Sequence, residues 1–239
     1  MKNKSVLITG SSSGLGYDLC KTFLDSGWKV YGISRSESKL PISEVVCDFK
    51  NLELLRESIA KLEIKSIDTI ILNAGTLGNL SKQSEITIEE YMDVFTINVL
   101  SNKIILDYVL DELKVNVKNV IGISSGASRK TYYGWGLYCI SKASFNQLIS
   151  SYSDEYTNTH FISISPGPMK TKMQDIIQNT NDSEIPSVRR FHKLYFDMNS
   201  SLEVAKEIYR NLSFINRYKS GIFIELKEIK SNDAENDIL

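Results

Sequence analysis

Short runs of apolar residues alternate along the chain with longer segments in which apolar residues recur every three or four positions. The short runs are typical of buried strands, and they lie at residues 5–9, 28–33, 45–47, 69–72, 119–124, 161–165 and 222–226. The longer segments are typical of amphipathic helices, and they lie at residues 15–26, 52–62, 88–113, 138–156 and 202–212. Strands that are apolar on both faces and separated by helices predict an α/β fold of the doubly wound Rossmann type, with a mostly parallel seven-stranded sheet and helices on both faces.

One segment, residues 168–201, departs from this alternation. It follows the sixth expected strand and mixes polar with aromatic side chains. Because a connection of this length is usually functional, we expect it to form a lid over the substrate. No linker or internal repeat divides the chain, so we expect residues 1–239 to form a single domain that ends in a polar tail from about residue 228.

The charge balance narrows the choice of partners. Lys and Arg number 28, and Asp and Glu number 29, which gives a net charge of −1 at pH 7. A chain without a basic excess is poorly suited to bind nucleic acid through its phosphates. Its apolar runs are too short to cross a membrane and its N-terminus lacks the apolar segment of a signal peptide, so we expect a cytoplasmic protein with no membrane partner. The three cysteines and two histidines lack the spacing of a disulfide framework or a metal site, so we expect no metal.

A glycine-rich segment follows the first expected strand and precedes the first expected helix. Its glycines fall in the pattern G-x-x-x-G-x-G, which permits a tight turn and a close approach of a pyrophosphate to the backbone. The helix that follows would offer free N–H groups and the positive end of its dipole. We therefore expect a dinucleotide to bind at this loop, through Gly10, Ser12, Ser13, Gly14, Leu15 and Gly16.

The end of the second expected strand indicates which dinucleotide binds. An NAD site usually places an acid there, about 20 residues after the glycine loop, to bind the ribose 2′-hydroxyl. Here Ser34 stands in that place and Arg35 follows it. A guanidinium pairs with a 2′-phosphate, which a carboxylate would repel. We therefore predict that the cofactor is NADP(H).

Tyr138 and Lys142 lie four residues apart on one face of an expected helix. A free phenol has a pKa of about 10 and is a poor acid or base at neutral pH. A lysine ammonium about 4 Å away, at an effective dielectric constant of about 20, would favour the phenolate by about 4 kcal/mol and lower this pKa by about three units. The pair therefore predicts a tyrosine that exchanges a proton with a carbonyl or alcohol oxygen.

Together with other motifs, this pair makes the chain resemble the short-chain dehydrogenase/reductase family, from residue 5 to about residue 228. The motifs occur in the family's order as Thr9-Gly10-x-x-x-Gly14-x-Gly16, Asp48, Asn73-Ala74-Gly75, Asn98, Ser124-Ser125, Tyr138-x-x-x-Lys142, and Ser165-Pro166-Gly167 with Thr171. The distance from Ser125 to Tyr138 along the chain agrees with the family's spacing between its catalytic serine and tyrosine. The resemblance therefore makes Ser125, rather than Ser124, the catalytic serine.

The resemblance implies a role for each of these residues. Tyr138 would donate a proton to a carbonyl oxygen as a hydride arrives from the nicotinamide, and Ser125 would hydrogen-bond the same oxygen. Lys142 would hold the ribose hydroxyls of the cofactor and tune Tyr138, and Asn98 would position a water that links Lys142 to solvent. The remaining family positions would bind the cofactor: Asp48 at the adenine amino group, Thr171 at the nicotinamide carboxamide, and Asn73, Ala74, Gly75, Pro166 and Gly167 beside them.

Residues 73–78, 134–139 and 166–174 carry a narrower resemblance, to sepiapterin reductases and the bacterial benzil reductase group. Those enzymes reduce the 1,2-dicarbonyl side chains of pterins, or aromatic diketones, with NADPH. In sepiapterin reductases an acid just past the last strand binds the pterin, and Glu228 falls in that region. The expected substrate contacts are Ser125, Trp135, Met169 and Glu228, with Met173, Phe191, Tyr195 and Phe196 as further candidates for an apolar pocket and lid.

These observations predict an NADPH-dependent carbonyl reductase that acts on a ketone or a 1,2-dicarbonyl substrate. One alternative is an oxidoreductase that acts on a sugar, an acyl-carrier intermediate or another biosynthetic intermediate. An alternative of another class is a regulator that senses NADP(H) without turnover, although such a protein would not need a proton relay. The resemblance also implies that the long helices at 88–113 and 138–156 pair with copies of themselves, in a homodimer or homotetramer.

Overall fold

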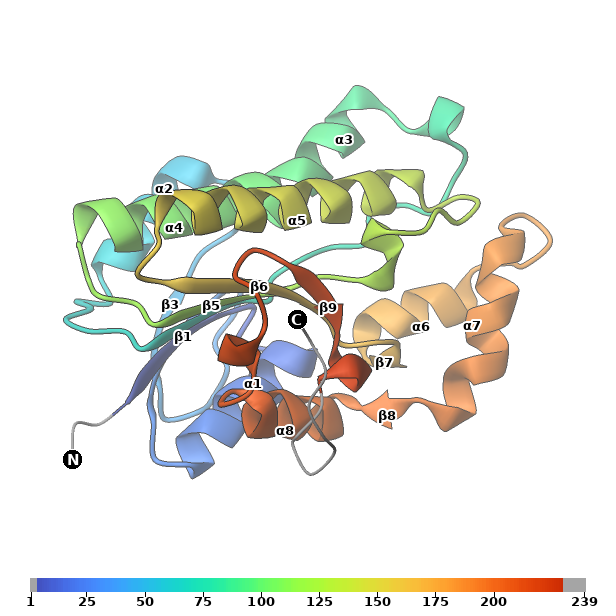
Figure 1. Ribbon diagram of the computed structural model, residues 1–239. Coiled ribbons are helices and arrows are strands. Elements are labelled where there is room, and N and C mark those ends of the chain that lie inside the picture. Colours follow the sequence, from blue (N-terminus) through green and yellow to red (C-terminus); the bar gives the residue numbers. More distant parts are fainter. Residues whose placement is uncertain (1–3, 230–239) are drawn as a thin grey trace.

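Seven parallel strands form the main sheet of the computed structural model, which describes residues 4–229 (Figure 1). Their order across the sheet is β3-β2-β1-β4-β5-β6-β9, and every pairing is parallel. The strands are β1 (Ser5–Thr9), β2 (Lys29–Ser34), β3 (Ser43–Val46), β4 (Thr69–Leu72), β5 (Asn119–Ile123), β6 (His160–Ser165) and β9 (Phe223–Glu225). The order reverses between β1 and β4, and doubly wound sheets bind their ligands at the carboxyl ends of the strands at such a point. The predicted doubly wound sheet is confirmed.

Helices cover both faces of this sheet. One face carries α2 (Leu52–Ala60), α4 (Ser101–Asp107) and α5 (Gly136–Glu155), and the other carries α1 (Gly14–Asp25) and α8 (Ser201–Asn211) (Figure 1). The alternation of side chains along a strand explains the two layers: Leu7 packs toward α5, whereas Val6 and Ile8 pack toward α1. Each layer buries its own apolar cluster.

The packing of α5 on the sheet depends on one glycine. A Cβ atom at Gly122 of β5 would lie 2.8 Å from the ring of Phe145 on α5, closer than a side-chain contact allows. Phe145 is fully buried, at 1% exposure. Gly122 therefore lets α5 lie close to the sheet, and this contact fixes the helix that carries Tyr138 and Lys142.

The long helix expected over residues 88–113 is continuous but not uniform. It consists of α3 (Ile88–Phe95), a π-helical turn (Thr96–Leu100), α4, and a second π-helical turn (Tyr108–Glu112). A π turn inserts one residue into the ladder of hydrogen bonds and often marks a functional position. Asn98 lies in the first of these turns.

The segment expected to form a lid contains regular structure. It includes α6 (Lys172–Asn179) and α7 (Arg189–Leu194), which lie beside the main sheet in Figure 1. Two short strands, β7 (Met169–Lys170) and β8 (Asn199–Ser200), pair in parallel and join the two ends of the segment. The helices α6 and α7 therefore lie between two chain segments that the pairing of β7 with β8 holds together. We refer to residues 168–201 as the lid segment.

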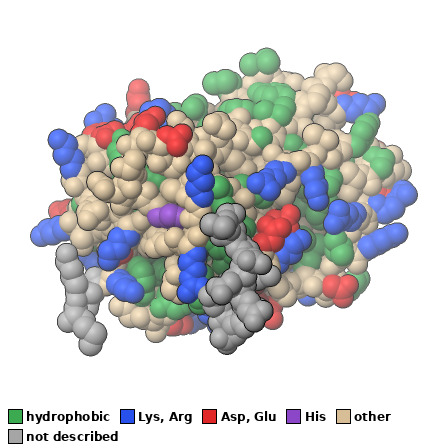
Figure 2. Space-filling model, in the orientation of Figure 1, with side chains coloured by type: hydrophobic (Ala, Val, Ile, Leu, Met, Phe, Trp, Pro, Cys, Tyr) green, Lys and Arg blue, Asp and Glu red, His purple; other side chains and the backbone are tan. Residues whose placement is uncertain are grey.

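The surface matches the balanced composition. Figure 2 shows basic and acidic side chains distributed over one face without a continuous basic surface. Among the described residues, no helix combines the length and the apolar composition needed to cross a membrane. Cys20, Cys47 and Cys139 are buried and unpaired. A polar tail is expected from about residue 228, and its residues beyond 229 lie outside the part of the chain that the structure describes.

Candidate active site

The glycine loop after β1 folds tightly against the end of β4. Gly10 and Gly14 have φ angles of +74° and +53°, which favour glycine. A Cβ atom at Gly16 would lie 2.1 Å from the carbonyl oxygen of Gly10 and 2.6 Å from Nδ2 of Asn73. Any side chain at Gly16 would therefore force the loop apart.

Thr9 joins the ends of β1 and β4 below this loop. Its Oγ1 accepts hydrogen bonds of 2.9 Å from the backbone N–H groups of Asn73 and Ala74, and Nδ2 of Asn73 donates back to the Thr9 carbonyl at 2.9 Å. The predicted cofactor residues Asn73 and Ala74 are thus held at the crevice. The role of Thr9 was not predicted, because a threonine that ends a strand carries no distinctive signal.

The geometry of the loop fits a bound pyrophosphate. Ser13 begins α1 in an extended conformation, and its side chain does not cap the helix, so it leaves the first-turn N–H groups for another acceptor. Gly14 faces Thr171, whose methyl carbon would lie 3.6 Å from a Cβ atom at Gly14. The structure therefore brings the loop together with Thr171, which begins α6 and accepts a hydrogen bond from Gln174 N at 3.4 Å.

The end of β2 is tied to the same loop. The Ser11 hydroxyl donates to the Ser34 hydroxyl at 3.2 Å, and Ser34 donates to the carbonyl of Ser36 at 2.6 Å. A Cβ atom at Gly32 would lie 2.7 Å from Oγ of Ser11, so glycine is needed for this contact. Ser34 is buried at 2% exposure, whereas Arg35 is exposed beside it. Ser34 therefore positions the loop, and Arg35 offers the positive charge.

Two of the predicted cofactor positions lie in exposed turns. Asp48 follows β3 and accepts a hydrogen bond from Lys50 N at 3.0 Å, which orders its turn. Gly167 follows β6 with a φ angle of +81°, and a Cβ atom there would meet nothing within 4 Å. The space beside Gly167 is therefore open, and the neighbouring Pro166 is half-buried.

Both polar atoms of the Asn98 side-chain amide form hydrogen bonds. Its Oδ1 accepts from Thr76 N at 2.8 Å, and its Nδ2 donates to Thr76 O and to Oγ of Ser141, each at 2.9 Å. Asn98 and Ser141 are both buried, at 1% and 0% exposure. These bonds connect the π turn, the loop after β4 and helix α5 through one amide.

Ser125, Tyr138 and Lys142 converge as predicted from the motif order. Tyr138 lies in the first turn of α5 and Lys142 one turn later, and the Lys142 ammonium is 6.0 Å from the centre of the Tyr138 ring. Ser125 follows β5 and hydrogen-bonds the Tyr138 hydroxyl. Lys142 Nζ donates to the carbonyl of Ile123 at 2.9 Å. A Cβ atom at Gly75 would lie 3.4 Å from Lys142 Nζ and 3.3 Å from Oδ1 of Asn98, so Gly75 leaves room for both groups.

The pKa values of this pair differ from the expectation. Burial raises the pKa of Tyr138 to about 12, and the hydrogen bond from Ser125 offsets this only in part. Burial also lowers the pKa of Lys142 to about 8. The predicted depression of the Tyr138 pKa was wrong for this state of the protein, because the estimate from charge alone omitted the cost of burying a phenolate. At neutral pH Tyr138 therefore keeps its proton.

An apolar cluster lies over the Tyr138 ring and includes part of the lid segment. We call it the lid cluster, and its buried members are Leu77, Ala127, Trp135, Tyr138, Cys139, Ile177, Ile185 and Val188. Trp135 stacks on Phe191 of α7, with ring centres 4.9 Å apart and planes at 25°. Met173 of α6 packs against the same cluster. The structure thus places Trp135, Met173 and Phe191 with Tyr138.

The other candidates for substrate contact lie elsewhere. Met169 is buried in the core layer between the sheet, α1 and α8. Phe196 is 85% exposed and contacts Tyr195 edge to face. Glu228 is exposed, and its carboxylate accepts a hydrogen bond from Glu225 N at 3.1 Å. This bond gives Glu228 a local structural role, and a role in binding a pterin stays a prediction.

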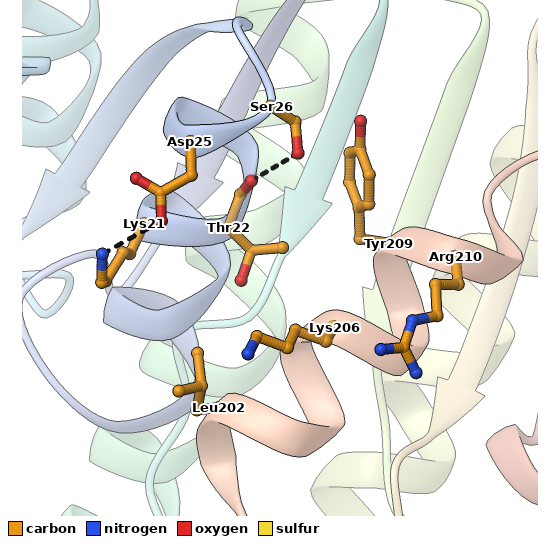
Figure 3. A pocket seen from close by; sticks show the side chains of 8 residues that line it. All are labelled: Lys21, Thr22, Asp25, Ser26, Leu202, Lys206, Tyr209 and Arg210. Atoms are coloured by element: carbon orange, nitrogen blue, oxygen red, sulfur yellow. Dashed lines mark hydrogen bonds and ion pairs between the residues drawn. The ribbon is translucent and has the colours of Figure 1, made fainter.

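A separate pocket of about 360 Å³ lies between α1 and α8 (Figure 3). Its lining residues are Lys21, Thr22, Asp25, Ser26, Leu202, Lys206, Tyr209 and Arg210. None of them was a predicted site residue, and none belongs to the lid cluster. The pocket is therefore distinct from the group around Tyr138.

Comparison with known proteins agrees with this arrangement. The model of the short chain dehydrogenase family matches residues 4–182. A benzil reductase of Bacillus cereus is 30% identical in an alignment that covers 93% of this chain and 99% of that protein. A sepiapterin reductase of Bos taurus is 26% identical over 193 residues, which cover 76% of this chain and 68% of that protein. These relatives confirm the narrower resemblance predicted from the motifs.

Solved structures agree as well. A short-chain dehydrogenase/reductase of Saccharomyces cerevisiae superposes with a TM-score of 0.82 and 26% sequence identity, over 95% of this chain and 97% of that one. The fold, the order of the motifs and the family match all indicate the same family. The chain therefore belongs to the short-chain dehydrogenase/reductase family and is an oxidoreductase.

Proposed function

We propose that this oxidoreductase is an NADPH-dependent carbonyl reductase that reduces a ketone or a 1,2-dicarbonyl compound, with Tyr138 as the proton donor. The observation that carries the proposal is that half-buried Ser125 lies with the buried Tyr138 and Lys142 beside an apolar cluster supplied in part by the lid segment. The similarity of the chain to benzil reductases supports the same substrate class.

The residues around Tyr138 suit reduction. Bound NADPH would supply the hydride that reaches the carbonyl carbon. Tyr138, with a pKa of about 12, holds its proton at neutral pH and transfers it from Oη to the carbonyl oxygen, which completes the alcohol. Ser125 donates a second hydrogen bond to that oxygen and so favours the charge that develops on it.

Lys142 and Asn98 support the return of the proton. Lys142 has a pKa of about 8 and is mostly protonated at pH 7, so its charge stabilises the phenolate that Tyr138 becomes. Asn98 holds the adjacent loop through Thr76 and keeps the backbone in place around Lys142. The phenolate then takes up a proton from solvent, which restores the starting state.

The cofactor preference rests on the end of β2. Arg35 is exposed, it forms no salt bridge with any of residues 4–229, and no carboxylate stands at the end of the strand. Its guanidinium is therefore available for the 2′-phosphate of NADPH. The single-domain organisation, the lid function of residues 168–201, a cytosolic location and a homodimer or homotetramer belong to the same proposal.

Turnover with a panel of substrates tests the proposal. The purified protein is assayed with benzil, a pterin diketone, a quinone and a 3-oxoacyl thioester, and NADPH oxidation is followed by its absorbance. We expect the diketones to react fastest. A protein that binds NADPH and oxidises it with none of these compounds would contradict the proposal and favour a regulator that senses the cofactor.

A further inference from the structure

One polar group in the lid cluster has no partner. Trp135 is 4% exposed, and its indole N–H forms no hydrogen bond with any of the residues that the structure describes. An indole N–H can only donate, so it needs an acceptor. Because a buried donor without an acceptor costs free energy, its presence calls for an explanation.

The ring that carries this N–H is firmly held. It stacks on Phe191 and lies 5.5 Å from the ring of Tyr132. The backbone carbonyl of Trp135 accepts a hydrogen bond of 2.9 Å from Cys139 N, in the first turn of α5. A side chain fixed from both the lid segment and α5 has little freedom to rotate toward another acceptor.

The indole also lies beside the reactive phenol. The ring centres of Trp135 and Tyr138 are 6.3 Å apart, with planes at 65°. Ser124 Oγ, next to Ser125, and Gln174 Nε2, on α6 of the lid segment, are also buried without a partner among residues 4–229, but the Trp135 N–H belongs to a ring that packs on Tyr138 itself. The unpaired donor therefore belongs to a ring that packs edge-on against Tyr138, the residue that the substrate carbonyl would meet.

We propose that the Trp135 indole N–H donates a hydrogen bond to the second, unreacting oxygen of a 1,2-dicarbonyl substrate. This inference rests on the proposed carbonyl reductase function and deepens it. Ser125 and Tyr138 bind the oxygen that is reduced, and Trp135 binds its neighbour. A site built to donate to an oxygen disfavours an analogue that lacks it, because the buried donor then stays unpaired. Trp135 is thus a specificity-determining residue for vicinal dicarbonyl compounds.

A matched pair of substrates and a matched pair of variants test this role. Benzil and deoxybenzoin differ in one position, where deoxybenzoin has a methylene group in place of the second carbonyl. The variant Trp135→Phe keeps an aromatic ring against Phe191 but removes the N–H. We expect it to lower kcat/KM for benzil about tenfold more than kcat/KM for deoxybenzoin. The control Phe191→Leu disturbs the stacking and keeps the N–H, so it should affect both substrates alike.

The chain offers a second readout that needs no variant. It contains two tryptophans, Trp28 and Trp135, so the wild-type protein has two indole N–H signals in a nitrogen–proton NMR spectrum. With NADP⁺ bound, addition of benzil should shift the Trp135 signal more than addition of deoxybenzoin, and the Trp28 signal serves as an internal reference. An equal response to both compounds would overturn the inference.

The outcomes separate this inference from the proposed function. If the wild type reduces benzil and Trp135→Phe keeps the same preference for benzil over deoxybenzoin, the inference is wrong and the proposed function stands. If the wild type reduces neither diketones nor simple ketones, the proposed function fails and the inference fails with it. A selective loss of the benzil preference in Trp135→Phe supports both.

Discussion

Asn98 and Ser141 lie 43 positions apart in the chain, and a buried hydrogen bond of 2.9 Å joins them. The Ser141 hydroxyl in turn donates to the backbone carbonyl of Tyr138 at 2.8 Å. Ser141 therefore links the π turn that carries Asn98 to the first turn of α5, which contains Tyr138. Without the Ser141 hydroxyl, the hydrogen bond that joins the Asn98 amide to α5 would be lost.

We expect Ser141→Ala to lower kcat roughly tenfold or more, because a small displacement in the site reduces the rate steeply. It should also lower the free energy of unfolding by about 1–3 kcal/mol, since the Asn98 amide loses a buried partner. Ser101→Ala is the matched control. Its hydroxyl is equally buried and donates to Ile97 O at 2.7 Å, but it does not reach α5. Ser101→Ala should lose stability and keep kcat; an equal loss of kcat in both variants would refute the link.

Ser125→Ala tests the second hydrogen bond to the carbonyl oxygen. Removal of one donor that stabilises a developing charge costs about 100-fold in rate, so kcat should fall by roughly that factor while the NADPH dissociation constant changes little. Ser124→Ala is the neighbouring control, because the Ser124 hydroxyl is buried and has no hydrogen-bond partner within residues 4–229. Steady-state kinetics of both variants decide the matter. A change confined to KM in Ser125→Ala would assign the residue to substrate binding instead.

The pH dependence of reduction follows from Lys142. Its pKa is lowered to about 8, so the ammonium is present below that pH and lost above it. Because the charged form stabilises the Tyr138 phenolate, kcat/KM for reduction should be level below about pH 8 and fall as the pH rises through it. Tyr138, at about 12, adds no break in this range. A rate that increases through pH 8 would contradict this role of Lys142.

Arg35→Ala tests the cofactor preference. A charge-assisted hydrogen bond contributes about 1.5–3 kcal/mol, so NADPH should bind roughly 10-fold to 150-fold more weakly. NADH lacks the 2′-phosphate and serves as the internal comparison, with nearly unchanged affinity. Titration calorimetry with both cofactors measures the difference. An equal loss of affinity for both would show that Arg35 does not contact the 2′-phosphate.

Much of the fold could be predicted because its strands are continuous apolar runs. Thr69–Leu72 is the same in the pattern and in the structure. The π turn around Asn98 could not be predicted, since an inserted residue leaves the apolar spacing of the neighbouring turns nearly intact. The lid helices α6 and α7 were expected only as a connection, because their sequences are polar and their apolar residues pack against the lid cluster rather than the sheet.

The candidate site shows the same division. The order of motifs located Ser125, Tyr138 and Lys142, which the structure brings together. Ser141 was not found, because a serine inside a helix gives no signal until its partner Asn98 is seen opposite it. The direction of the Tyr138 pKa was mistaken, because the spacing of two residues reveals their charges but not how deeply they are buried.

Tyr138→Phe tests whether Tyr138 donates the proton. Phenylalanine keeps the ring in the lid cluster and removes only the hydroxyl. The measurement is single-turnover reduction of benzil by NADPH, together with the NADPH dissociation constant of the same preparation. We expect the rate to fall by about 1,000-fold, the scale of general acid catalysis, while NADPH binds as tightly as before. A variant that binds NADPH normally and still reduces benzil at a substantial fraction of the wild-type rate would contradict it.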